Sequence, residues 1–134
     1  MALPCPTSRK VKGRGLKPKK IFIWGKEKAR IFLSAKLEDS AIYCSVITVA
    51  EIFAGMKEHE REKTVALIES LNILDVTHEI AEKAGTYKRD ENRQPLALDD
   101  CFIAATAFVN GAVLATGNGK HYPMKDIEKE IVKP

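Results

Sequence analysis

Cysteine is scarce in this sequence, and long apolar runs are missing. Cys5, Cys44 and Cys101 are odd in number and far apart, with no C-x-x-C pair and no histidine at the spacing of a zinc site. The most apolar stretches, residues 41–47 and 101–109, are far shorter than the run of about 18 that a membrane span requires. The basic start does not lead into a signal-peptide apolar region. These absences argue against a thiolate zinc site and predict a protein of the reducing cytoplasm.

Acidic residues are missing from the first twenty positions, which hold three prolines and two glycines. The cations there are Arg9, Lys10, Lys12, Arg14, Lys17, Lys19 and Lys20. Because these seven exceed the total net charge of +4, the remaining residues carry −3. We predict a disordered basic leader over residues 1–20, followed by one domain over residues 21–134. The leader either stays solvated or acts as a nucleic-acid-binding arm.

Beyond the leader, apolar patterning alternates between helix and strand periods. Helical spacing predicts helices at residues 27–37, 48–56, 61–71, 79–89 and 99–110. Branched and aromatic runs predict strands at residues 41–47, 73–76 and 112–116, with a short one near 131–132. The run at residues 21–24 is too short to assign by periodicity. This order predicts an α/β fold with a parallel sheet and helices on both faces.

Ligands in such folds bind beyond the carboxyl ends of the strands, where this chain places several polar residues. Glu51 follows the strand at residues 41–47, and two interpretations fit it. Thr48 at an N-cap and Glu51 three residues later would form a capping box, with Ile47 and Ile52 as the hydrophobic staple. Alternatively, the Glu51 carboxylate coordinates a divalent cation.

Two adjacent acids, Asp99 and Asp100, open the most apolar predicted helix. One of them is explained by helix capping. The pair is harder to explain, because neighbouring negative charges repel unless a cation or solvent separates them. Farther along, glycines flank Asn118, which indicates a turn with residues tolerant of positive φ. The same turn could instead present backbone N–H groups, the Asn118 amide and Lys120 to a phosphate.

Three segments resemble the second, third and fourth signatures of VapC-type PIN domains, in the family's order. They are residues 45–51 (SVITVAE), 100–107 (DCFIAATA) and 114–122 (LATGNGKHY). The match covers roughly residues 27–132. The resemblance implies a three-layer sandwich whose acids gather at one end of a parallel sheet to hold Mg²⁺ or Mn²⁺. It also implies an endoribonuclease that is the toxin of a toxin–antitoxin pair.

Carried over residue by residue, the resemblance makes Glu51 and Asp100 the metal-site carboxylates. Asn118 becomes the polar residue that supports a metal-bound water, and Asp99 becomes the cap. Hard oxygen ligands of this kind select Mg²⁺ or Mn²⁺. His59, His78 and His121 receive no role and are predicted to be surface or packing residues. The implied partners are an RNA substrate, an antitoxin and a second copy of the chain.

The family's first signature, a strand that ends in an aspartate, is not matched. No acid precedes Glu27. If residues 21–24 are that strand, Gly25 stands where the acid belongs. The interpretation that the sequence favours instead makes residues 21–24 the end of the family's first helix, with the first strand lost or replaced by the leader. Either alternative removes a charge from the metal site. A catalytically inactive module that still binds an antitoxin or dimerises is therefore the rival hypothesis.

Overall fold

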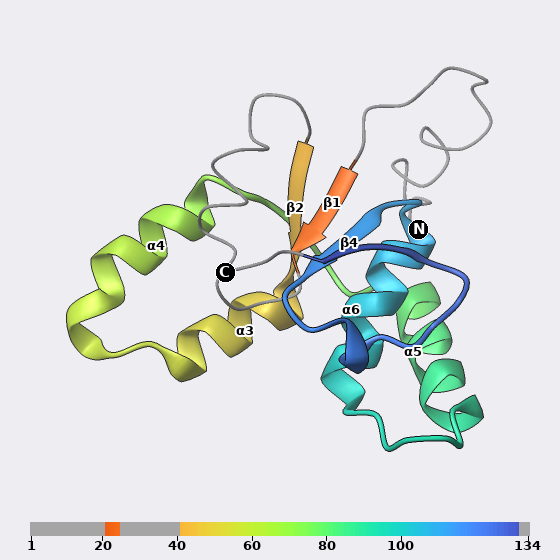
Figure 1. Cartoon of the computed structure of the whole chain (residues 1–134). Coiled ribbons are helices and arrows are strands. Elements are labelled where there is room, and N and C mark those ends of the chain that lie inside the picture. The colour runs from red at the N-terminus through yellow and green to blue at the C-terminus, as the bar shows by residue number, and fades with distance from the viewer. Residues whose placement is uncertain (1–20, 25–40, 132–134) are drawn as a thin grey trace.

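The protein is seen in a computed structural model, which describes residues 21–24 and 41–131 (Figure 1). The described strands form one sheet in the order β3-β2-β1-β4-β5, and every neighbouring pair is parallel. These strands are β1 (Ile21–Trp24), β2 (Ala41–Ser45), β3 (Asn72–Leu74), β4 (Val113–Thr116) and β5 (Glu128–Ile131). The predicted parallel sheet is confirmed. The predicted helix at 27–37 and the leader at 1–20 lie outside the described residues.

The helices follow the predicted order, with ends shifted by a few residues. They are α3 (Val46–Gly55), α4 (Arg61–Glu69), α5 (His78–Asp90) and α6 (Leu98–Val109). Two short 3₁₀ turns complete the described elements, η1 (Glu58–Glu60) and η2 (Gly119–His121). Within the part of the chain that the structure describes, no helix has the length and apolarity needed to cross a bilayer.

The favoured interpretation of residues 21–24 is wrong, because they form the central strand. In β1, Trp24 pairs with Cys44 of β2 on one side and with Ala115 of β4 on the other. The short apolar run therefore supplies the first strand of the fold, and the first strand is neither lost nor replaced. A four-residue run carries too little periodicity to distinguish strand from helix, so only the pairing with both neighbours decides the matter.

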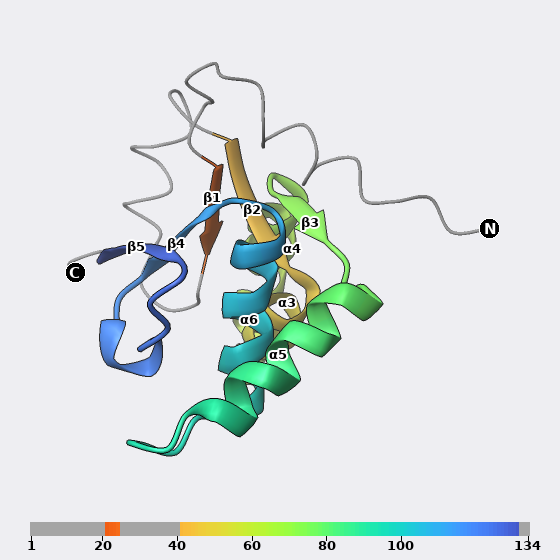
Figure 2. The same ribbon diagram turned by 90° about the vertical axis from the view of Figure 1, so that its right-hand side faces the viewer.

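The two faces of the sheet are covered by different helices (Figures 1 and 2). Tyr43 and Leu114 pack into the cluster formed with α5 and α6, whereas Cys44 and Ala115 pack toward α3 and α4. Successive strand residues therefore alternate between the two layers, as the strand geometry requires. Helix α6 is buried almost throughout, and its alanines allow the close approach of α5 that Figure 2 shows.

Helix α6 ends where the sequence predicts, at Asn110 and Gly111. Gly111 has φ 62°, which favours glycine because a side chain rarely tolerates that conformation. Its N–H donates to Phe108 O at 3.2 Å, and the N–H of Ala112 donates to Ala107 O at 2.9 Å. This pair of bonds is the Schellman arrangement. It turns the chain directly into β4.

Helix α3 begins earlier than the sequence predicts, and this removes the capping-box explanation for Glu51. Ser45 is the N-cap, and its Oγ accepts from Ile47 N at 3.0 Å. Thr48 lies inside the first turn and is fully buried. Ser45 rather than Thr48 is the N-cap because β2 leads directly into the helix without a loop. Glu51 therefore lies one turn beyond the cap, and helix initiation does not explain it.

Replacing Ser45 with alanine is expected to lower the free energy of unfolding by about 1–2 kcal/mol, because the partly buried Ile47 N–H loses its acceptor. Urea denaturation measures the change. Ser70→Ala is the matched control: Ser70 is exposed, and its hydroxyl donates to Leu67 O. The control is expected to stay within about 0.5 kcal/mol of the unchanged protein. Equal effects of the two substitutions would contradict the capping role.

Candidate active site at the carboxyl edge of the sheet

Asp100 lies in the first turn of α6, which starts at the carboxyl edge of the parallel sheet because the helix runs back against β4. Only 5% of the residue is exposed. Its Oδ1 accepts from the hydroxyl of Tyr122 at 3.2 Å, and its Oδ2 lies 3.6 Å from Nδ1 of His121. A carboxylate this buried is costly unless polar groups or a cation compensate it. The structure thus brings Asp100 together with the segment that follows β4.

Asp99 occupies the same helical turn but is not the N-cap residue, which is Ala97. The prediction that Asp99 is the N-cap is wrong by two positions. Its Oδ1 nevertheless accepts from Asp100 N at 3.0 Å, which satisfies one of the N–H groups that a helix start leaves open. Asp99 is therefore bound to the local backbone at the helix start.

Glu51 reaches the same region from α3. The side chain is partly buried, and its Oε1 has no contact with solvent. Burial and then the charge of Asp100 raise the pKa of Tyr122 well above its ordinary value, and the charges of Glu51 and Asp99 raise it further. Three carboxylates thus act on one phenol that is 1% exposed. The phenol stays protonated and donates to Asp100.

Asn118 forms the predicted turn, although the turn differs in its conformation. Asn118 has φ −137°, and Gly111 is the one glycine with positive φ within residues 21–24 and 41–131. An added Cβ at Gly119 would lie 2.8 Å from Cδ1 of Ile131. That atom ends an exposed, flexible side chain that can move aside, so this contact does not require glycine at position 119.

The alternative of a phosphate-binding backbone loop at Asn118 is not supported, because the turn uses its own N–H groups. Asn118 N donates to Thr116 Oγ1 at 3.1 Å, and Lys120 N donates to Asn118 Oδ1 at 3.2 Å. The N–H groups of His121 and Tyr122 also donate within the turn. Backbone donors that are already paired do not form an anion cradle.

His121 is exposed, as the sequence predicts, but its ring also contacts the site. Its Nε2 lies 3.1 Å from Nδ2 of Asn118, and its Nδ1 faces Asp100. His59 and His78 are exposed elsewhere, as predicted. Sequence patterning did not single out His121 or Tyr122, because their spacing from Asp100 exceeds twenty residues. Only the return of β4 beside α6 brings them together.

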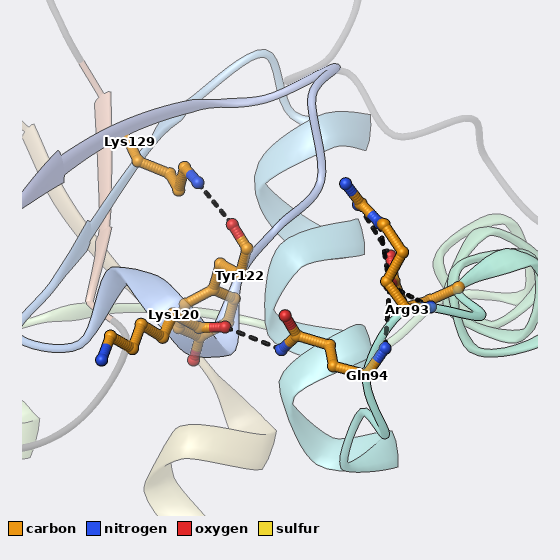
Figure 3. A network of polar contacts seen from close by, with 6 residues as sticks. Arg93, Gln94, Lys120, Tyr122 and Lys129 are labelled. Atoms are coloured by element: carbon orange, nitrogen blue, oxygen red, sulfur yellow. Dashed lines mark hydrogen bonds and ion pairs between the residues drawn. The ribbon is translucent and has the colours of Figure 1, made fainter.

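The turn that carries these side chains is held by two neighbours (Figure 3). Gln94 Nε2 donates to Lys120 O at 2.9 Å, and the ammonium of Lys129 donates to Tyr122 O. The loop that contains Gln94 is itself fixed by Glu91, which accepts from Arg93 and from Gln94 N. Both bonds hold the backbone of the segment whose His121 and Tyr122 side chains contact Asp100.

Glu51 and Asp100 provide the carboxylate oxygens that a hard cation binds. The acid that the family's first signature would add is missing from the sequence. Across residues 21–24 and 41–131, no three His, Cys, Asp or Glu side chains are grouped closely enough to hold a metal ion. Carboxylate oxygens with low exposure at Glu51 and Asp100 suit Mg²⁺ or Mn²⁺. The residue that follows β1 is Gly25, at the position where the predicted signature requires an acid.

Comparison with known families agrees with this geometry. The family model described as PIN domain matches residues 20–127. The chain belongs to the PIN domain family. Among curated proteins it is 38% identical over 100 residues to Ribonuclease VapC10 of Mycobacterium tuberculosis, a match that covers 72% of this chain and 74% of the relative. The resemblance to the VapC group of this family is thereby confirmed.

Solved VapBC structures share the fold. The VapBC-1 structure from nontypeable Haemophilus influenzae aligns with a TM-score of 0.68 at 21% identity, covering 84% of this chain and 98% of that chain. VapBC2 from Rickettsia felis, bound to a DNA fragment from its promoter, aligns with a TM-score of 0.66 at 19% identity, covering 82% and 97%. These identities support the fold alone.

Proposed function

We propose that this PIN domain chain is a divalent-metal-dependent endoribonuclease that acts as the toxin of a toxin–antitoxin pair. The observation that carries the proposal is the buried Asp100 carboxylate, which accepts from Tyr122 at the carboxyl edge of the sheet and whose neighbourhood also feels the charge of Glu51. The 38% identity to Ribonuclease VapC10 supports RNA as the substrate class. Glu51 and Asp100 would hold Mg²⁺ or Mn²⁺, and Asn118 contributes at the same edge.

The protein's own residues prepare the site for a phosphodiester. Two carboxylates that are partly shielded from solvent repel the negatively charged RNA backbone. RNA therefore binds productively only if a positive charge lies between these carboxylates and the phosphate. Glu51 and Asp100 would hold a divalent cation that would supply that charge and lower the pKa of water. Tyr122 donates to Oδ1 of Asp100, whereas Oδ2 lies 3.6 Å from Nδ1 of His121. The turn at residues 117–121, in which Gly117, Lys120 and His121 are exposed, would then form the side of the site open to RNA.

Single-stranded RNA cleavage with and without Mn²⁺ or Mg²⁺ tests the function. Cleavage is expected with the metal, and chelation is expected to remove it. Glu51→Gln keeps the side-chain volume but removes the charge, and is expected to reduce cleavage at least about tenfold by weakening metal binding. Glu82→Gln, an exposed acid on α5, is the control and should match the unchanged chain. Metal-dependent cleavage at an unchanged rate in Glu51→Gln would reject the assignment of Glu51 to the metal site.

A catalytically inactive PIN module is the second candidate, and one observation favours it. The central strand leads into Gly25 rather than an acid, and the described residues hold no group of three metal-ligating side chains. A folded chain that cleaves no RNA with either metal, yet binds an antitoxin, would establish this candidate. A folded chain that neither cleaves RNA nor binds an antitoxin would reject both.

An antitoxin protein and a second copy of the chain are the proposed macromolecular partners. VapBC structures are toxin–antitoxin assemblies, and those from Haemophilus influenzae and Rickettsia felis share this fold. Co-purification with a small protein encoded upstream tests the antitoxin, and light scattering tests the dimer. A monomer that does not bind such a protein would contradict both the antitoxin partner and the dimer. The cytoplasmic location stays a prediction of the sequence.

A further inference from the structure

The orientation of the Asn118 side chain is fixed by its own backbone. Its Oδ1 lies 3.2 Å from Lys120 N. A backbone N–H can only donate, so the atom facing it must be the amide oxygen. The other atom of the amide, Nδ2, is thereby directed to the His121 ring at 3.1 Å from Nε2. Asn118 thus presents a donor, and not an acceptor, to the imidazole.

The donor from Asn118 selects one tautomer of His121. Because Nδ2 of Asn118 donates to Nε2, this ring nitrogen holds a lone pair and carries no proton. The proton of the neutral imidazole therefore resides on Nδ1. That nitrogen lies 3.6 Å from Oδ2 of Asp100. The separation is longer than a hydrogen bond, so the N–H dipole acts on the carboxylate by electrostatic attraction.

Asp100 is consequently faced on both oxygens by N–H or O–H groups from one turn. Tyr122 donates to Oδ1 at 3.2 Å, and His121 faces Oδ2. The side chain of Asp100 is 7% exposed, whereas that of His121 is 46% exposed. A series of contacts from Lys120 N through the side chains of Asn118 and His121 therefore connects the surface turn to the buried Asp100 carboxylate.

We propose that His121 is a positioning residue for Asp100, and that Asn118 acts by setting the His121 tautomer. The proposal rests on the proposed nuclease function, in which Asp100 binds the metal. Partners that orient a ligating carboxylate reduce the reorganisation needed when the cation binds, and their loss typically costs about 10–100-fold in metal affinity or activity. Asn118 is thereby given a role through His121 that differs from direct support of a water.

Nuclear magnetic resonance of ¹⁵N-labelled histidine tests the tautomer without metal or RNA. Spectra at about pH 8.5 lie well above the pKa near 6.5 of free histidine. The chain has three histidines, His59, His78 and His121, so His121→Gln identifies the signals of His121. We expect the Nδ1–H tautomer in the unchanged chain. Asn118→Asp replaces the donor with an acceptor and is expected to move the proton to Nε2.

Two substitutions at His121 separate the two ring nitrogens. His121→Asn places an amide N–H near the position of Nδ1, whereas His121→Gln extends to the level of Nε2 and does not reproduce that donor. We expect His121→Asn to keep Mn²⁺ affinity and RNA cleavage within about threefold, and His121→Gln to lose at least about tenfold in both. His78→Gln, at an exposed position, is the control for a changed histidine count.

The outcomes separate this inference from the proposed function. An Nδ1–H tautomer that switches in Asn118→Asp supports the positioning of Asp100 even in a chain that cleaves no RNA, where only the proposed function fails. An Nε2–H tautomer in the unchanged chain would overturn the inference, whatever the activity. Equal Mn²⁺ affinities of the His121→Asn and His121→Gln chains would overturn it as well.

Discussion

Replacing Asp100 with asparagine is expected to abolish RNA cleavage, with a loss of at least about 100-fold, while the protein stays folded. The charge that would hold the cation disappears, and a ligating residue should cost at least as much as the residues that orient it, which cost about 10–100-fold. Asparagine keeps the side-chain volume and an oxygen that can accept from Tyr122. The free energy of unfolding should therefore change by no more than about 1 kcal/mol.

Asp99→Asn is the matched control for this experiment. Asp99 belongs to the same helical turn, and its Oδ1 accepts from Asp100 N. An amide oxygen can make the same bond, so cleavage should remain within a few-fold of the unchanged chain. Initial rates of RNA cleavage and urea denaturation of both variants complete the comparison. Retained cleavage in Asp100→Asn, or equal losses in the two variants, would place the active site elsewhere.

Introducing an acid at position 25 is expected to strengthen metal binding, in contrast to the losses above. Trp24 pairs with Cys44 and Ala115. The next residues of these two neighbouring strands, Ser45 and Thr116, lie buried at the carboxyl edge. Gly25 directly follows Trp24 in the sequence, and we therefore expect Gly25→Asp to add a carboxylate to the edge that carries Glu51 and Asp100.

Affinity for a hard cation depends on how many charged ligands a site supplies. Gly25→Asp is therefore expected to raise Mn²⁺ affinity on the order of tenfold or more, measured by calorimetric titration, and to raise RNA cleavage with it. Gly85→Asp adds the same charge on α5, where an added Cβ would meet nothing within 4 Å, and should leave Mn²⁺ affinity unchanged. An equal response to both substitutions would show that position 25 is not part of the site.

Much of the fold could be predicted from local patterns. Helices α5 and α6 could be predicted from local sequence, because their periodicity, length and end signals, including Gly111 at the end of α6, are typical of helices. The start of α3 is less predictable, because Ser45 and Thr48 are both suitable N-caps, and the choice depends on where β2 ends. The role of residues 21–24 depends on pairing with two distant strands, which no local pattern contains.

The candidate site divides in the same way. Residue type and position made Glu51, Asp100 and Asn118 candidates, and the resemblance to the VapC-type PIN signatures assigned their roles. Tertiary structure alone decided that His121 and Tyr122 face Asp100 and that Asn118 directs its amide to the imidazole. The physical reason is that orientation and proton position depend on neighbours brought together by sheet pairing, whereas charge and helical period belong to the chain itself.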